Sequence, residues 1–251
     1  MSSILLSSTN NFTTGPTDPH FSNVALLFDG QTLTDQSSYA HSMTTNSIDL
    51  STAGGSPYSD GTTAYLSNAH TDTFYSGTLS TTAVGTGAFT IEFWVRLNDI
   101  KNWNTMFTSR NASSAQYLEN TSTKWWIGSN DATSYGGLYM WSGGSIRVTL
   151  GNVLSENTWY YVALSRESDG SLHLYYGTTP GGSFTAKATG TSTVSYTGNN
   201  YGIGGPANNA AAASLEWLNG YIRDLRFTVG VARYTGAASA ETVPSQSHPT
   251  R

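Results

Sequence analysis

The sequence contains no cysteine and few charged residues. The absence of cysteine excludes disulfide bonds and zinc sites with thiolate ligands. Only 11% of the residues are charged, whereas a typical domain has about 25%. The 11 Lys and Arg residues are scattered and the net charge is −5. We therefore expect no nucleic-acid partner, because nucleic-acid binding depends on clustered basic residues.

Long apolar runs are also missing. The start of the chain has no basic residue, and its apolar run extends only from Ile4 to Leu6. A signal peptide needs about 7–15 apolar residues after a positive start, and a membrane-spanning helix needs about 18 or more. The sequence therefore predicts neither a signal peptide nor contact with a membrane.

Helical periodicity is nearly absent, and short apolar segments with strand character recur between turn residues. Residues 89–97 alternate between apolar and polar, which is typical of a half-buried strand. The apolar face of this strand consists of Ile91, Phe93, Val95 and Leu97. Trp94 lies on the opposite face, which indicates that other residues or a ligand cover that face.

Two further strands are expected at residues 159–166 and 172–176, joined at Asp169-Gly170, a strong hairpin signal. Ile222 and Leu225 are three positions apart in another strand, so a bulge or strong twist is expected there. About ten such strands without βαβ units indicate a sandwich or barrel.

The periodic part of the chain lies between two polar ends. We expect an N-terminal arm at residues 1–22, one domain at residues 23–235 and a C-terminal tail at residues 236–251. Both ends are rich in Ser, Thr and Pro, and they are expected to contact a partner rather than the core. Phe12 and Phe21 are the only aromatic residues of the arm and its predicted contacts.

Three segments resemble a known family. Laminin G-like, or pentraxin-like, modules of the concanavalin A-like lectin/glucanase superfamily resemble residues 89–97 (FTIEFWVRL), residues 157–175, which hold the hairpin, and residues 218–227 (LNGYIRDLRF). This resemblance implies an all-β, two-sheet antiparallel jelly-roll sandwich.

A narrower resemblance concerns two other segments. Residues 24–30 (VALLFDG) and 228–236 (TVGVARYTG) resemble lectin-like modules of tailed-phage structural proteins. The chain departs from that pattern at Arg223, where the family often has a second Asp. The narrower resemblance implies a virion protein that is assembled in the host cytoplasm and functions outside it.

No catalytic group is apparent in the sequence. The glucanases of this superfamily carry a Glu-x-Asp-x-x-Glu strand that supplies an acid and a nucleophile. The nearest match begins at Glu167 and Asp169, lacks the last acid, and is better explained as a hairpin turn. The five histidines show no metal-ligand spacing. We expect that the protein is not an enzyme and needs no cofactor, with one exception to consider.

That exception is calcium, which many members of the superfamily bind. Calcium prefers several oxygen ligands, usually including carboxylates. Asp224 in the closing strand and Asp29 near the opening one are expected to approach each other when the sandwich closes. The alternative is that Asp224, beside Arg223 and Arg226, is a salt-bridged strand residue.

Aromatic residues of the middle third are the remaining candidates for a binding site. Exposed rings stack on sugar faces and anchor protein interfaces. The candidate glycan or protein contacts are Trp103, Trp125, Trp126, Tyr135, Tyr139 and Trp141. For any single tryptophan, including Trp125, burial in the core is the alternative.

The favoured interpretation is a non-catalytic structural protein on the phage virion surface, such as a capsid decoration or cement protein. Its partners would be the major capsid protein or tail components. A tail-fibre or receptor-binding module that recognises host polysaccharide is the first alternative. An extracellular bacterial carbohydrate-binding module is the second alternative. The fold alone does not choose between these three functions.

Overall fold

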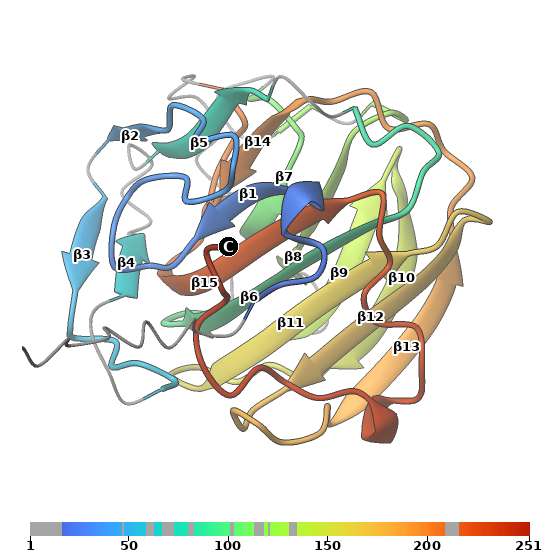
Figure 1. The fold of residues 1–251 in the computed structure, drawn as a ribbon. Coiled ribbons are helices and arrows are strands. Elements are labelled where there is room, and N and C mark those ends of the chain that lie inside the picture. Colours follow the sequence, from blue (N-terminus) through green and yellow to red (C-terminus); the bar gives the residue numbers. More distant parts are fainter. Residues whose placement is uncertain are drawn as a thin grey trace, which may run out of the picture.

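A computed structural model describes ten parts of the chain: residues 17–46, 48–58, 63–66, 73–79, 83–100, 103–112, 118–119, 121–130, 135–208 and 216–251. These residues form two antiparallel sheets packed face to face, with two short 3-10 helices (Figure 1). The expected all-β jelly-roll sandwich is confirmed.

The first sheet is the one nearer the viewer in Figure 1. In order across the sheet, its strands are β13 (Ala186–Thr191), β12 (Ser171–Gly177), β11 (Trp159–Arg166), β6 (Phe89–Leu97), β15 (Gly220–Val229), β4 (Thr63–Leu66) and β3 (Asp49–Ser51). Strand β1 (Val24–Phe28) also pairs with β15, beside β6 and β4. The last strand of the domain, β15, therefore pairs directly with the first, β1.

The second sheet lies behind the first. Its strands, in order, are β10 (Ser145–Asn152), β9 (Gly137–Ser142), β8 (Trp125–Asn130), β7 (Asn104–Thr108), β14 (Asn200–Ile203), β5 (Thr73–Thr78) and β2 (Thr44–Asn46).

The main core fills the space between the two sheets, and the alternation seen in the sequence determines which residues enter it. The apolar face predicted for residues 89–97 is buried there, and Val162, Leu164 and Leu225 of the neighbouring strands join it. The β11–β12 hairpin turns at Gly170, whose φ of 91° is strained for other residues. Its turn is closed by the Gly170 N–H, which donates to the Glu167 carbonyl at 3.0 Å.

The expected irregularity in β15 is a β-bulge. The pairing with β6 moves from Arg223 opposite Trp94 to Arg226 opposite Glu92. Three steps along β15 therefore face two steps along β6, so one residue of β15 is unmatched. Asp224 lies in this bulge with a φ of 57°, and the bulge lets Ile222 and Leu225 both enter the core.

The C-terminal residues differ from expectation. The chain leaves β15, passes in front of the first sheet to η2 (Ala238–Ala240), and returns across the sheet (Figure 1). Val243 is fully buried there, in a second apolar cluster with Trp94, Tyr161 and Tyr175. The segment 236–251 is thus part of the fold, because it covers the apolar outer face that Trp94 indicated.

The expected N-terminal arm is also partly integrated. Asp18 is buried, and its main-chain N–H donates to the carbonyl of Arg251 at 3.0 Å, so residue 18 lies beside the C-terminal residue. Phe21 begins the 3-10 helix η1 (Phe21–Asn23) and is half-buried. Phe12 lies outside the described residues.

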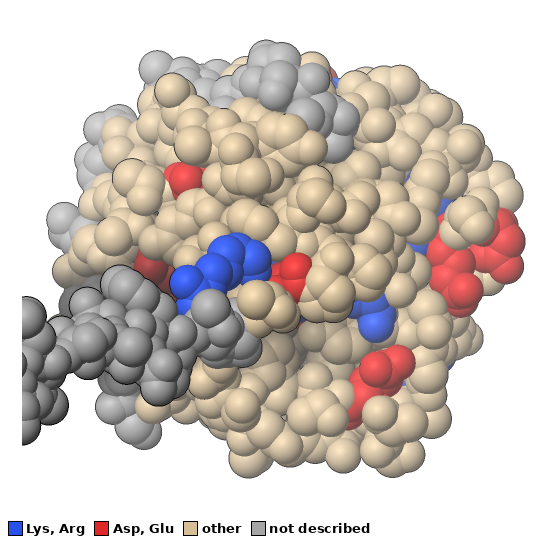
Figure 2. Space-filling view, viewed as in Figure 1, with Lys and Arg blue, Asp and Glu red and all other residues tan. Residues whose placement is uncertain are grey.

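The surface on this side of the molecule is poor in charge. Figure 2 shows a face on which most atoms belong to residues that are neither acidic nor basic. Charged residues are therefore as scarce over this side as the composition indicates. No helix within the described ranges is long and apolar enough to cross a membrane.

A substitution in the C-terminal segment tests this packing. Val243→Asp places an unpaired charge at a fully buried position, and should lower the free energy of unfolding by several kcal/mol. Thr242→Asp, at the exposed neighbouring position, is the control and should change it by less than about 0.5 kcal/mol. Urea denaturation measures both, and equal stabilities would refute the packing.

Candidate ligand-binding face

Aromatic side chains gather on the outer face of the second sheet. Alternation along β8 and β9 sends Trp125 into the core and Trp126 outward. Trp126 pairs with Trp141 across the two strands, and Gly128 pairs with Tyr139. The three outward rings of β8 and β9 therefore lie on adjacent strand positions.

Trp103 completes this group. Its ring centroid lies 5.8 Å from that of Trp126 and 6.4 Å from that of Trp141. Trp126 in turn meets Tyr139 edge-on, with centroids 5.9 Å apart. We call Trp103, Trp126, Tyr139 and Trp141 the aromatic face.

The members of the aromatic face differ in exposure. Trp126 and Tyr139 are 1% and 4% exposed and form its base. Trp103 and Trp141 are partly exposed. The indole N–H of Trp126 has no hydrogen-bond acceptor among the described residues, which is unusual for a buried donor.

A glycine makes room for this arrangement. A Cβ atom at Gly128 would lie 2.2 Å from the Trp126 ring and 2.2 Å from the Asn104 carbonyl oxygen. Such contacts are far closer than atoms can approach, so only glycine lets the Trp126 ring lie over the sheet.

A buried cation supports the base of the aromatic face. The Arg110 guanidinium carbon lies 5.7 Å from the Trp126 ring centroid. Its Nη1 donates to the Glu216 carboxylate at 2.9 Å, and its other nitrogens donate to the carbonyls of Leu118 and Glu119. Burial raises the pKa of Glu216, although the Arg110 charge opposes this effect. Arg110 and Glu216 thus join β7 to the residues before β15.

The structure brings four of the six predicted aromatic residues together. Trp125 belongs instead to the main core, where it stacks on Phe89 with ring centroids 5.1 Å apart. This is the core alternative that the sequence left open. Tyr135, before β9, is 55% exposed and, among the described residues, makes no ring contact with the aromatic face.

The two carboxylates considered for calcium have separate partners. Asp29 Oδ1 accepts the main-chain N–H groups of Gln31 and Thr32 and organises its own loop. Asp224 accepts hydrogen bonds from the Tyr58 hydroxyl and the main-chain N–H of His248. Within the described ranges, no three His, Asp or Glu residues are placed to hold a metal ion.

Four charged residues form a buried network on the outer face of the first sheet, and the sequence indicated only one of them, Arg226, as a member of an ion pair. Glu92 Oε1 accepts from Arg226 Nε at 2.8 Å, and Arg226 Nη1 donates to Asp18 at 3.0 Å. Arg233 holds the same Asp18 carboxylate with two nitrogens, at 3.0 and 2.7 Å. We call Asp18, Glu92, Arg226 and Arg233 the buried ionic cluster.

Two tyrosines complete the surroundings of Glu92. The hydroxyls of Tyr161 and Tyr234 both donate to Glu92 Oε2. Arg233 and Tyr234 belong to the segment 228–236 that carries the narrower resemblance. Arg233 and Tyr234 therefore have a structural role in this chain, because their side chains bind Asp18 and Glu92. The residues next to them in the sequence do not indicate this role.

Among the described carboxylates, Glu92 and Asp224 have the most strongly shifted pKa values. Burial acts to raise the pKa of Glu92, but Arg226 and the other partners outweigh it and lower it to about 2. Burial raises the pKa of Asp224 to about 7. Perturbed acids often mark active sites, yet both residues are 0% exposed beneath the C-terminal segment. A substrate cannot reach them in this conformation.

The low pKa of Glu92 makes a prediction for stability. Its folded pKa of about 2 lies below the ordinary 4.5, so its stabilisation is complete above about pH 4.5 and is lost toward pH 2. Glu92→Gln should lower the free energy of unfolding at pH 7 by about 3–5 kcal/mol and reduce this acid-dependent loss. Glu156→Gln, at an exposed position, is the control. Unchanged pH dependence in Glu92→Gln would contradict the assignment.

Comparisons with known proteins agree with this architecture. The model of the concanavalin A-like lectin/glucanases superfamily matches residues 60–231. The chain therefore belongs to this superfamily. No curated protein sequence matches it significantly.

Several solved structures share the fold. Domain 4 of an extracellular arabinanase from Geobacillus stearothermophilus, in complex with arabinotriose, has a TM-score of 0.54 and 15% identity over 84% of this chain and 94% of that chain. The botulinum neurotoxin serotype D binding domain has a TM-score of 0.56 and 15% identity over 84% and 49% of the two chains. The binding domain of botulinum neurotoxin DC, in complex with SialylT, has 0.56 and 14% over 83% and 48%.

This chain spans about half the length of those neurotoxin binding domains. At these identities the likeness shows the fold alone. The family and the structural neighbours together define a lectin-like jelly-roll domain.

Proposed function

We propose that this chain is a non-catalytic binding module that contacts glycan through the aromatic face. The observation that carries this proposal is the pair of partly exposed rings, Trp103 and Trp141, held over the buried Trp126. Tryptophan rings that are fixed in place lose little conformational entropy when a sugar stacks on them. The buried Trp126 indole N–H, which has no acceptor among the residues that the structure describes, lies beneath that surface.

Two similar folds support a saccharide ligand. The arabinanase domain is in complex with arabinotriose, and one neurotoxin binding domain is in complex with SialylT. The absence of a usable acid pair in the sequence supports a module that binds without cleaving. The most perturbed carboxylates, Glu92 and Asp224, are covered by the chain itself.

For the biological setting, we propose the surface of a tailed-phage virion, with assembly in the host cytoplasm. The support is the resemblance of residues 24–30 and 228–236 to phage structural modules. A capsid decoration protein, in contact with the major capsid protein, remains the favoured form. The aromatic face also suits a tail-fibre or receptor-binding module for host polysaccharide, or an extracellular bacterial carbohydrate-binding module.

A tryptophan substitution tests the binding role. The ligand is first chosen from a glycan array and then titrated by calorimetry. Trp141→Ala should weaken binding about tenfold or more, because central tryptophans dominate interfaces, while the melting temperature changes little at this partly exposed position.

Tyr39→Ala is the matched control, because Tyr39 is 42% exposed and stacks on His41, away from the aromatic face. It should bind as the unsubstituted chain does. Failure of every glycan on the array, or equal losses in both variants, would refute the proposed binding role.

The virion setting has its own test. Quantitative mass spectrometry of purified particles should find the chain at a copy number comparable with that of the major capsid protein. A copy number comparable with that of tail proteins would favour the receptor-binding form. Absence of the chain from purified particles would refute the virion setting altogether.

A further inference from the structure

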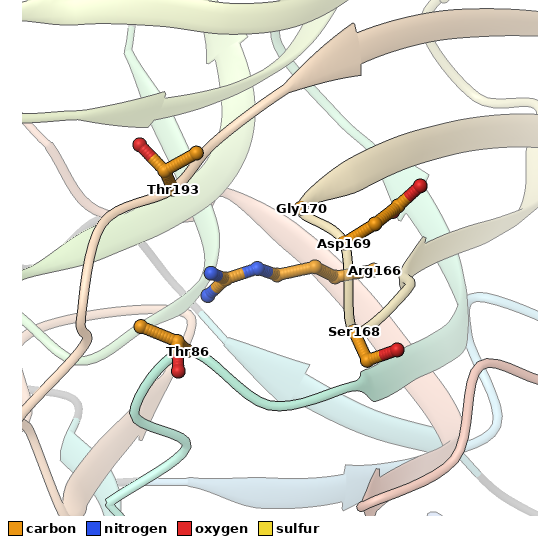
Figure 3. Close-up of a pocket in the computed structure, with 6 residues that line it drawn as sticks. All are labelled: Thr86, Arg166, Ser168, Asp169, Gly170 and Thr193. Carbon is orange, nitrogen blue, oxygen red and sulfur yellow. The ribbon is translucent and has the colours of Figure 1, made fainter.

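A small cavity opens beside the turn of the β11–β12 hairpin. Its volume is about 140 Å³, and Figure 3 shows the residues that line it: Thr86, Arg166, Ser168, Asp169, Gly170 and Thr193. None of these residues belongs to the aromatic face. The cavity is therefore a separate place where a ligand could bind.

Arg166, the last residue of β11, extends into this cavity. Figure 3 shows its guanidinium group between Thr86 and Thr193, with the side chains of Ser168 and Asp169 pointing away from it. The residue is 1% exposed overall. Its position is fixed from two sides, because Nη1 donates to the Gly85 carbonyl at 3.1 Å and the group stacks 5.1 Å from the Tyr196 ring centroid.

The charge of Arg166 has no anionic partner among the described residues. Its Nε has no acceptor there, and Asp169, which lines the same cavity, points away from the guanidinium group (Figure 3). A guanidinium group stays protonated in proteins. Burying a cation without a matching anion is costly, and an anionic ligand would remove that cost.

The size and charge of the cavity restrict the ligand. A volume of about 140 Å³ equals roughly five water molecules, which suits one carboxylate and part of a sugar ring but not a whole oligosaccharide. The exposed Asp169 at the rim repels a phosphate dianion more strongly than a carboxylate monoanion. Thr86 and Thr193 also line the cavity, so two threonine side chains flank the guanidinium group where a polyhydroxylated ligand would lie.

We propose that this cavity binds the carboxylate of an acidic sugar residue. The planar guanidinium of Arg166 matches a carboxylate and offers it Nε–H and Nη–H donors. The neighbouring threonine hydroxyls add hydrogen bonds to the sugar. The preference for a carboxylate rests on Arg166, whereas the saccharide class rests on the proposed function.

The test titrates the full chain with sodium glucuronate, glucose and inorganic phosphate, followed by NMR. Glucuronate should bind with a dissociation constant of about 1 mM, as expected for a single small ligand. Glucose and phosphate should each bind at least about tenfold more weakly, since glucose lacks the charge-assisted contact and phosphate is repelled by Asp169.

Three variants locate the site. Arg166→Met should weaken glucuronate binding about tenfold or more. Asp169→Asn should strengthen glucuronate binding about two- to fivefold, because it removes from the exposed rim a negative charge that repels the carboxylate. This surface variant also tests the site if Arg166→Met fails to fold. Trp141→Ala should leave glucuronate binding unchanged.

These outcomes separate the two proposals. Glucuronate binding that depends on Arg166 supports this inference even if no glycan binds the aromatic face. Glucuronate binding that is lost in Trp141→Ala would overturn it and favour the aromatic face. Stronger binding of phosphate, no binding of glucuronate, or no effect of Asp169→Asn would also overturn it.

Discussion

A glutamate buried beneath the C-terminal segment organises the outer face of the first sheet. Glu92 lies on the central strand β6 and accepts hydrogen bonds from Arg226, Tyr161 and Tyr234. Arg226 also reaches Asp18 near the start of the described chain. One carboxylate therefore links the middle of the sheet to residues from both ends of the sequence.

Such a cluster does not guarantee high stability. Well-packed apolar residues can stabilise a protein as much as a buried ion pair, because desolvating the charges is costly. Loss of one member, however, leaves its partner buried and unpaired. The buried ionic cluster therefore acts mainly as a constraint that fixes the chain after β15 in one arrangement, with Val243 and His248 buried against the sheet.

This arrangement determines where a ligand can bind. The C-terminal segment covers Trp94, Tyr161 and Tyr175 on the first sheet, so those aromatic residues are not accessible. On the second sheet, Trp103 and Trp141 remain partly exposed. One outer face is covered by the chain and the other is partly exposed, which explains why only some of the aromatic residues are candidates for binding.

Much of the fold could be predicted from the sequence, because alternation and turn residues are local signals. The β6 core face, the hairpin at Gly170 and the bulge near Asp224 all follow from residue spacing. Trp94 even indicated that its face is covered. The covering segment itself was missed, because its polar composition conceals single anchors such as Val243.

The site was predictable only in part for a similar reason. Period two places Trp126, Tyr139 and Trp141 on one face once the strands are paired, but the sequence does not give the pairing. It also does not reveal that Trp125 points inward. The buried ionic cluster joins residues more than 200 positions apart, such as Asp18 and Arg233. No local sequence pattern predicts such contacts.

Hydrogen exchange tests most directly the claim that the C-terminal segment is an integral part of the fold. The amide of Val243 donates to the Gly182 carbonyl at 2.8 Å, and that of His248 donates to Asp224 at 2.9 Å. Both amides should exchange slowly, with opening free energies near those of central strands such as β11. Exchange of both at the rate of an unstructured peptide, while β11 stays protected, would contradict the account.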